Sequence, residues 1–372
     1  MTAAGASVCT IGIEEEYQIV DAETGDLRSR ARDVLPAARD EGGDEVQAEL
    51  YQSQIEIASR VCTTLGDVRD ELVRLRRAVI GAVERDGGRV LAAGTHPFSD
   101  WRDQQATPKH RYRQSVLTYE QITRELVIFG CHVHVGMPDR ESGLQVLNRA
   151  RLWLAPILAL TGSSPYWLGA DTGYASYRTQ LWNRLPISGP PAAFASITEY
   201  EALVDALVST GSIADETRIY WDLRLPVKTE TIEFRMTDVC STVDEAVMVA
   251  GMVRALACIA LESARRDEPF NPVRQELLRA AHWRAARYGM DRDLVDLHAM
   301  QSVPAGELVD QLMAHLRPAL EDAGDWDEVS RILEWVRAEG IGARRQRAAY
   351  GRDGRLADVV ELIAEETARG VR

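Results

Sequence analysis

Residues 11–20 read "IGIEEEYQIV" and place three consecutive carboxylates in an otherwise mostly apolar stretch. A side-chain period of two is typical of a β-strand. On such a strand Glu14 and Glu16 share one face, and Glu15 points to the opposite, apolar face. We expect the two carboxylates that share a face to carry the chemistry of this strand. A change of Glu15 is expected to be mild.

Two later segments repeat this arrangement, at residues 127–137, "VIFGCHVHVGM", and 231–238, "TIEFRMTD". In each segment one face is apolar and the other carries polar groups. These polar groups include His132, His134, Glu233 and Arg235. For any one strand, a sheet with one face in water remains an open explanation. Glycines beside the histidines would leave room for a ligand, so the three strands together favour faces that line one cavity.

Such a cavity would bring Glu14, Glu16 and Glu233 together without enough fixed positive charge. Like carboxylates at close range raise one another's pKa or require a cation. Oxygen-rich clusters suit Mg²⁺ or Mn²⁺, and Mg²⁺ held by a few carboxylates typically brings substrate phosphates with it. Arg235, on the same face as Glu233, can stabilise a phosphoryl group. The strands therefore predict a metal site that handles phosphate.

The rest of the chain predicts one α+β domain over residues 1–372 with an antiparallel or mixed sheet. Expected strands lie at residues 45–59 (two strands with a bend), 89–96 and 218–225, and expected helices lie at residues 64–86, 141–162 and 198–210, with a mostly helical C-terminal third. Residues 163–191 form a long irregular stretch, and loops of this length are usually functional or disordered. Its tyrosines and tryptophans argue against disorder. The basic segment "KHRYR" at residues 109–113 reads as a loop, with a solvated surface preferred over nucleotide binding.

Composition limits the partners. The 372 residues carry a net charge of −14, which argues against nucleic acid and anionic membranes. Five scattered cysteines, an odd number without CxxC spacing, argue against a disulfide framework or a zinc ribbon and favour the cytoplasm. We expect no signal peptide in the first ten residues and no membrane span. The composition leaves a homo-oligomer open.

The motifs resemble those of the glutamate–cysteine ligase type 2 family, the ATP-dependent carboxylate–amine ligases. The resemblance covers most of the chain and rests on the segments "GIEEEYQIV", "GCHVHVGM", "GYASYRTQLWNRLP" and "TIEFRMTDV". It implies a glutamine synthetase-like fold, in which a curved, mainly antiparallel sheet forms a funnel with helices outside. ATP and Mg²⁺ (or Mn²⁺) would lie in the funnel.

The same resemblance implies the roles of individual residues. The metal ligands would be Glu14, Glu16, Glu49, Glu56, His132 and Glu233. Arg235 would contact phosphate, and Arg178 would contact a substrate carboxylate or the transferring phosphoryl group. Glu49 and Glu56 would face opposite sides of a straight strand, so either the chain bends or one of them is a solvent-facing acid. For His134, a histidine satisfied inside the sheet is preferred over a site residue.

The expected function is therefore an ATP-dependent ligase that forms an amide through an acyl phosphate. By resemblance, glutamate and cysteine are the default small-molecule substrates, with γ-glutamylcysteine, ADP and phosphate as products, and a different amine substrate stays open. Two alternatives are a metal-dependent hydrolase that uses the same acids to activate water and a non-catalytic nucleotide- or metal-binding protein. The intact set Glu14, Glu16, Glu233 and Arg235 argues against the last of these.

Overall fold

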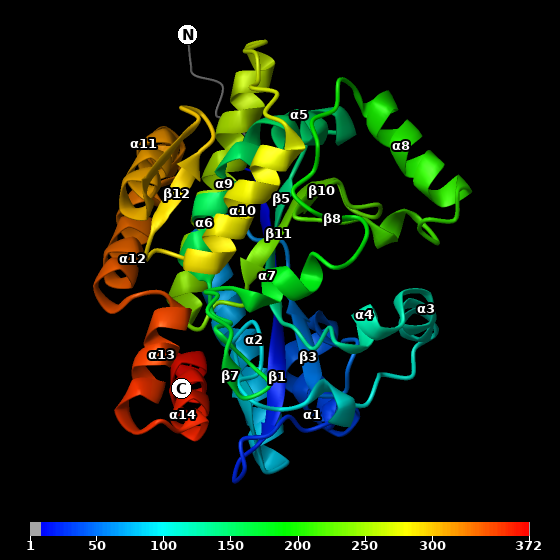
Figure 1. The fold of residues 1–372 in the computed structure, drawn as a ribbon, viewed down its shortest axis with the longest axis vertical. Helices are drawn as coiled ribbons and strands as arrows, with labels where there is room; N and C mark the ends of the chain where they lie inside the picture. The colour runs from blue at the N-terminus through cyan, green and yellow to red at the C-terminus, as the bar shows by residue number, and fades with distance from the viewer. Residues whose placement is uncertain (1–8, 372) are drawn as a thin grey trace.

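The computed structural model describes residues 9–371 (Figure 1). Most of the segment on which the expectation of no signal peptide rests lies outside this range. A seven-stranded sheet forms the centre, in the order β10-β11-β5-β1-β3-β2, with β4 also paired to β1. Its strands are β1 (Ile11–Asp21), β2 (Val46–Ala48), β3 (Gln54–Ala58), β4 (Gly88–Leu91), β5 (Gly130–Gly136), β10 (Leu223–Arg224) and β11 (Thr231–Asp238). All its pairings are antiparallel, which confirms the expected α+β class.

Helices surround this sheet and make up most of the C-terminal third, as predicted. They are α1 (Ala31–Gly42), α2 (Leu65–Arg85), α3 (His110–Tyr119), α4 (Gln121–Arg124), α5 (Arg140–Ala150), α6 (Leu154–Thr161), α7 (Tyr177–Trp182), α8 (Ile197–Ser209), α9 (Val243–Arg265), α10 (Gln275–Tyr288), α11 (Ala305–Ala323), α12 (Trp326–Glu339), α13 (Gly342–Asp353) and α14 (Leu356–Ala368), with short 3-10 turns η1 (Gly43–Glu45), η2 (Trp101–Asp103), η3 (Arg151–Trp153) and η4 (Glu216–Arg218). Three two-stranded ribbons complete the fold: β6 (Tyr166–Trp167) with β7 (Ala170–Asp171), β8 (Ser188–Gly189) with β9 (Tyr220–Trp221), and β12 (Asp293–Asp296) with β13 (Gln301–Pro304).

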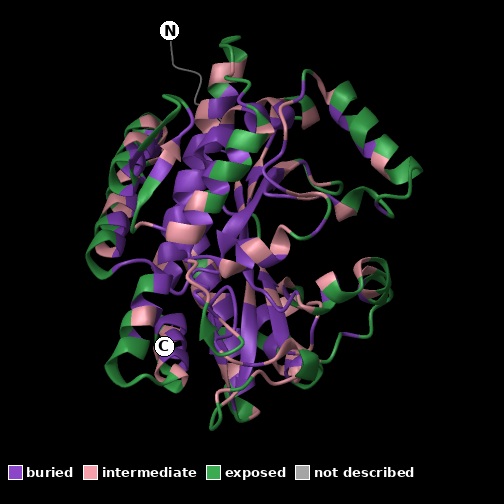
Figure 2. Cartoon of the chain, in the orientation of Figure 1, coloured by how far each residue is buried: buried purple, intermediate pink, exposed green. Residues whose placement is uncertain are grey.

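The apolar face of the sheet packs against α2 and α9, and this layer contains most of the core (Figure 2). Helix α2 begins at a capping box formed by Thr64 and Asp67, as the sequence predicts. Helix α9 is long and apolar enough to cross a membrane by length and composition alone, but 78% of its apolar segment is buried inside the protein. The helix is therefore an internal element of the fold. Because one face of the sheet is covered in this way, the polar side chains of its strands gather on the other face.

Two predicted elements differ from the structure. The helix expected over residues 141–162 is divided into α5 and α6 by the 3-10 turn η3. Pro156, in the first turn of α6, has no N–H group, and its ring would clash with the carbonyl of Leu152 in a continuous helix. The segment at residues 109–113 begins helix α3 instead of forming a loop. Tyr112 is the only buried residue in α3, so the sequence shows no apolar stripe there.

Candidate active site

The polar face of the sheet lines a cavity of about 630 Å³. Strands β1, β3, β5 and β11 form its floor, and α3, α7 and residues 215–229 contribute to its walls. The lining includes every residue to which the sequence gave a site role: Glu14, Glu16, Glu49, Glu56, His132, Arg178, Glu233 and Arg235. The expectation that the three polar strand faces line one cavity is thus confirmed.

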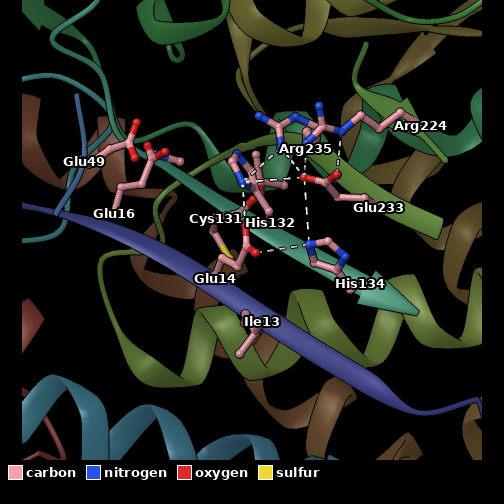
Figure 3. A network of polar contacts seen from close by, with 12 residues as sticks. Ile13, Glu14, Glu16, Glu49, Cys131, His132, His134, Arg224, Glu233 and Arg235 are labelled. Atoms are coloured by element: carbon pink, nitrogen blue, oxygen red, sulfur yellow. Dashed lines mark hydrogen bonds and ion pairs between the residues drawn. The ribbon is translucent and has the colours of Figure 1, made fainter. Parts of the chain in front are cut away.

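Strand register brings these residues together (Figure 3). Glu14 lies opposite His132 in the pairing of β1 with β5, and Glu233 lies opposite His134 in the pairing of β11 with β5. Glu16 lies opposite Glu56 in the pairing of β1 with β3. Paired residues on neighbouring strands point to the same face, so four separate strands supply one continuous polar surface.

The densest part of this surface is formed by Glu14, His134 and Glu233. One ligating atom from each of these three side chains lies within 4.8 Å of those of the other two. The Nε2 atom of His134 is 3.4 Å from Glu14 Oε1 and 3.9 Å from Glu233 Oε1. On the other side of Glu14, His132 Nδ1 is 3.3 Å from Oε2. These distances suit side chains that share one divalent cation better than a closed set of hydrogen bonds.

His134 therefore belongs to the cavity. This corrects the sequence-based preference for a histidine that is satisfied inside the sheet. Its Nδ1 atom contacts Thr231 Oγ1 at 3.1 Å, which orients the ring within the sheet. Its Nε2 atom faces the two carboxylates and makes no hydrogen bond of good geometry within residues 9–371, and the same holds for His132 Nε2. Buried polar atoms without partners mark places where a ligand is expected.

Electrostatics keep the two carboxylates of this group ionised. Burial raises the pKa of Glu14, but the adjacent imidazoles of His132 and His134 outweigh it and hold this pKa well below its usual range. Burial likewise raises the pKa of Glu233, but the charges of Arg235 and Arg224 outweigh burial and hold this pKa well below its usual range. Burial and the neighbouring Arg235 lower the pKa of His132 to about 4. His132 is therefore neutral at pH 7, the form in which an imidazole nitrogen binds metal.

A second carboxylate group lies next to the first and consists of Glu16, Glu49 and Glu56. Burial and the nearby Glu49 raise the pKa of Glu16 to about 7, although Arg178 and the Gly130 N–H oppose this. Burial, followed by Glu49, raises the pKa of Glu56 well above its usual range. Carboxylates in this condition either hold protons or bind a cation.

The position of Glu49 answers the question that the sequence left open. Strands β2 and β3 form an antiparallel hairpin in which Gln47 pairs with Glu56, so the chain reverses between the two acids. Glu49 lies just after β2, and its Oε2 atom accepts a hydrogen bond of 2.8 Å from the Tyr112 hydroxyl of α3. The nearby Arg111 Nη2 atom is 3.5 Å from the same oxygen. Both acids reach the cavity, and the basic segment lies at its wall.

Arginines provide the positive charge of the cavity. Arg235 and Arg224 both form ion pairs with Glu233. The ring of Trp182 lies near two of these arginines, with its centroid 5.7 Å from Arg235 Cζ and 6.0 Å from Arg178 Cζ. The Nε atoms of Arg235 and Arg178 are buried and have no hydrogen-bond partner in the described part of the chain. They are free to bind an anion such as a phosphoryl group or a carboxylate.

A buried carboxylate at the end of β11 holds Arg178 in place. Asp238 accepts hydrogen bonds from Ser163 N at 2.9 Å and from the hydroxyls of Ser164 and Ser176 at 2.7 Å each. Ser176 is the N-cap of α7, and Ser164 Oγ accepts a hydrogen bond from the backbone N–H of Arg178. The Arg178 guanidinium lies over Gly130, where any Cβ would collide with it. The long irregular stretch is thus ordered around this arginine.

Glu15 points to the opposite face, as predicted, but it is not idle. Its Oε1 atom is 2.6 Å from Arg76 Nη2 of α2, and both side chains are 0% exposed. Tyr17 donates its hydroxyl to the same carboxylate, and Arg76 also donates to the carbonyls of Cys240 and Ser241. This carboxylate is fully paired, so it joins β1 to α2 and to the end of β11.

Sequence reasoning gave no site role to the cavity residues Tyr112, Trp182 and Arg224, and for Arg111 it preferred a solvated surface over nucleotide binding. Arg224 lies opposite Glu233 in the pairing of β10 with β11. The alternation in the expected strand at residues 218–225 could have identified it. Tyr112 and Arg111 reach the cavity through tertiary packing of α3, for which the sequence offers no signal.

The polar face of the antiparallel sheet combines carboxylates, histidines and arginines in one cavity, and comparison with known proteins gives the family of the chain. The model of glutamate–cysteine ligase family 2 matches residues 10–362. A protein from Rhodopirellula baltica, named "Putative glutamate--cysteine ligase 2", is 45% identical over 97% of each chain. A relative from Frankia alni, named "Putative glutamate--cysteine ligase 2-2", is 42% identical over 97% of each chain.

The chain belongs to glutamate–cysteine ligase family 2 and is an ATP-dependent ligase that joins a carboxylate to an amine. The crystal structure of the Francisella tularensis glutamate–cysteine ligase in complex with AMP is similar, with a TM-score of 0.74 and 13% sequence identity. The match covers 98% of this chain and 89% of that one. It confirms the fold expected from the resemblance, the glutamine synthetase-like arrangement shared by glutamate–cysteine ligases.

Proposed function

We propose that this chain joins the γ-carboxylate of glutamate to the amino group of cysteine, with ATP converted to ADP and phosphate. The observation that carries this proposal is the cavity floor, where six acidic or imidazole side chains face two arginines with unpartnered donors among the described residues. Carboxylates and arginines in one buried cavity suit the binding of a polyphosphate together with divalent cations. The Francisella tularensis ligase of the same fold is a complex with AMP, which supports nucleotide binding here.

The donor atoms fit Mg²⁺ or Mn²⁺. Glu14, His134 and Glu233 would hold one ion, with His132 beside it, and the second carboxylate group would hold another. The unpartnered imidazole nitrogens and the raised pKa of Glu16 both support this assignment. When bound, such ions neutralise phosphate oxygens and orient a nucleotide for in-line attack.

The chain's own residues supply the remaining functions. The substrate carboxylate oxygen attacks the γ-phosphorus of ATP, the bond to ADP breaks, and an acyl phosphate forms. The amine nitrogen then attacks the acyl carbon, and phosphate leaves. Arg235 and Arg178 donate hydrogen bonds to the phosphoryl oxygens during transfer. Trp182 keeps both guanidinium groups in position, and burial of the cavity limits hydrolysis of the acyl phosphate.

The oxygen balance of this route gives a direct test. The glutamate γ-carboxylate is labelled with heavy oxygen, and the phosphate released in one turnover with ATP and cysteine is analysed by mass spectrometry. We expect one labelled oxygen per phosphate, with ADP as the nucleotide product. Label in AMP would indicate an acyl adenylate, and unlabelled phosphate would indicate plain ATP hydrolysis; either result overturns the proposal.

A screen of ADP release identifies the substrates independently of this route. The purified protein is incubated with ATP, Mg²⁺ and pairs of amino acids and amines, and ADP is measured. We expect the largest rate with glutamate and cysteine, and no ADP release when the carboxylate substrate is omitted. A higher rate with another amine would keep the acyl phosphate route and replace cysteine as the substrate.

A further inference from the structure

Four of the five cysteines form two close pairs outside the cavity. Cys9 precedes β1 by two residues, and its sulfur lies 2.9 Å from that of Cys258 in α9. Cys131 of β5 is hydrogen-bonded to Cys240, which follows β11. All five thiols are free. The first pair joins segments that are 249 residues apart in the sequence, so only the fold brings them together.

The first pair has the properties of a reactive dithiol. Cys258 is partly exposed, whereas Cys9 is 6% exposed. The contact between the Cys258 and Cys9 thiols lowers the pKa of Cys258 to about 7, with help from Arg254 and against burial and Asp325. A thiol that is accessible, partly ionised at neutral pH and adjacent to a second thiol is typical of cysteines that oxidise reversibly.

We propose that Cys258 and Cys9 form a reversible disulfide that ties the start of β1 to α9. Hydrogen peroxide serves as the two-electron oxidant. The Cys258 thiolate attacks one peroxide oxygen, the O–O bond breaks, and Cys258 becomes a sulfenic acid while hydroxide leaves and takes up a proton. The Cys9 thiol then attacks the sulfenic sulfur, the S–O bond breaks, and a second water leaves. The two cysteines lose two hydrogens in total, and a dithiol reductant restores them.

The sulfur separation makes this closure easy. A disulfide bond is about 2.05 Å long, so the two sulfurs need to approach by less than 1 Å. The two cysteines are 249 residues apart in a chain of 372, so the link would close a loop of about two thirds of the chain, and a link of that length restricts the unfolded chain strongly. Oxidation is therefore expected to raise the melting temperature. The cavity side chains of β1 point to the other face of the sheet, so turnover at low temperature should not change.

The second pair is a matched internal control. Cys131 and Cys240 are 0% and 2% exposed. The hydrogen bond with Cys131, together with burial, raises the pKa of Cys240 well above its usual range. These two thiols are also neighbours, but neither is accessible, and the Cys240 thiol resists ionisation. They should stay reduced under conditions that oxidise the first pair.

Peptide mapping of the full-length protein tests the proposal. The reduced protein is freed of reductant, treated with hydrogen peroxide at neutral pH, unfolded, alkylated and digested. We expect one cross-linked peptide pair that joins Cys9 to Cys258, lighter by two hydrogens and lost after dithiothreitol, while Cys131 and Cys240 are alkylated. A cross-link of Cys131 to Cys240, a cross-link of Cys9 to Cys62, or over-oxidised Cys258 beside alkylated Cys9 would overturn it.

Three variants separate the disulfide from a general effect of oxidation. Cys258→Ser should keep its turnover but lose both the cross-link and the rise in melting temperature. Cys9→Ser should keep Cys258 reactive, so that peroxide and dimedone together label Cys258 as a sulfenic acid. Cys240→Ser should leave the cross-link and the melting shift unchanged. A melting shift that persists in Cys258→Ser would show that the dithiol is not its source.

Discussion

The two faces of strand β1 treat the same type of side chain in opposite ways. Glu15 points into the core and meets a single dedicated cation, Arg76, at 2.6 Å. Glu14 and Glu16 point into the cavity, where the pKa of Glu14 is lowered by two histidines and that of Glu16 is raised by burial and by Glu49. The core carboxylate has one cation of its own, whereas the cavity carboxylates outnumber the cations that surround them.

This difference separates structural charge from functional charge. A buried ion pair is tolerated when both partners are present and their hydrogen bonds are satisfied. The pair on the core face meets this condition, because Arg76 donates to Glu15 and to two backbone carbonyls. On the cavity face, His132, His134, Arg178 and Arg235 each keep an atom without a partner among residues 9–371. Such a face is complete only when a ligand occupies it.

Among the changes on the two faces of β1, replacement of Glu14 is expected to have the largest effect. Glu14→Gln keeps the size of the side chain but removes a charge that lies between two imidazoles and Glu233. We expect kcat to fall by about 10³-fold or more, in the range of losing one major electrostatic contact to the reacting groups. The melting temperature should change little. A variant that turns over at the normal rate would contradict the assignment of this face.

The matched change on the core face is Glu15→Gln. It leaves Arg76 buried without a counter-charge, and losing one partner of such a pair typically costs about 3–5 kcal/mol. We expect a much lower midpoint in urea unfolding, while kcat per folded molecule stays close to that of the unchanged protein. Replacing both partners by apolar residues should recover most of the stability. The expectation that a change of Glu15 is mild for turnover stays a prediction, and the buried pair with Arg76 adds a loss of stability that the sequence did not predict.

Arg235→Lys tests whether the cavity needs the planar guanidinium group or only its charge, because this change keeps the charge. The lysine ammonium cannot reproduce the planar fork that pairs with Glu233 and faces the cavity. We expect kcat to fall about 10²-fold, again through lost contacts in the transition state, with a small change in melting temperature. Early melting combined with an unchanged rate per folded molecule would assign Arg235 to the fold instead.

The pH dependence of stability gives the smallest expected effect. Burial and Glu49 raise the pKa of Glu16 to about 7. Between the ordinary pKa of a glutamate and pH 7, the folded protein therefore binds more protons than the unfolded chain. The stability from protonated Glu16 is complete below the ordinary pKa and is lost as the pH rises through 7. We expect a loss of about 1–2 kcal/mol after solvent screening.

Melting curves measured from pH 5 to pH 8, with and without Mn²⁺, check this expectation. A bound divalent cation would replace the lost protons, so the stabilisation by Mn²⁺ should grow across the same pH range. Glu56, whose pKa burial also raises well above its usual range, should add to the effect. The Glu16→Gln variant is the control and should show a weaker pH slope. An unchanged slope would argue against Glu16 as its source.

The sequence predicted those features that depend on local periodicity. The strand at 231–238 coincides with β11, and a period of two alone decided which of Glu14, Glu15 and Glu16 faces the cavity. Glu14, Glu16, Glu233 and Arg235 line the cavity for the same reason, whereas the roles of Glu49, Glu56, His132 and Arg178 came from the family resemblance. A two-residue alternation needs no knowledge of the partner strand.

Features that depend on register and on distant packing could not be read in this way. Arg76 meets Glu15 across 61 residues, and Arg224 reaches Glu233 only through the pairing of β10 with β11. The choice between His132 and His134 depended on which nitrogen atoms face Glu14, which alternation cannot distinguish. Helix α3 was missed because it buries only Tyr112.

Titration of Mn²⁺ into the protein tests most directly whether the cavity face, and not the core face, binds a cation. Three proteins are compared by calorimetry at a temperature at which all are folded: the unchanged chain, Glu14→Gln and Glu15→Gln. We expect the unchanged chain and Glu15→Gln to bind Mn²⁺ equally well, and Glu14→Gln to bind at least about 10-fold more weakly. Equal binding by Glu14→Gln, or loss of binding in Glu15→Gln, would contradict the division of β1 into a structural face and a functional face.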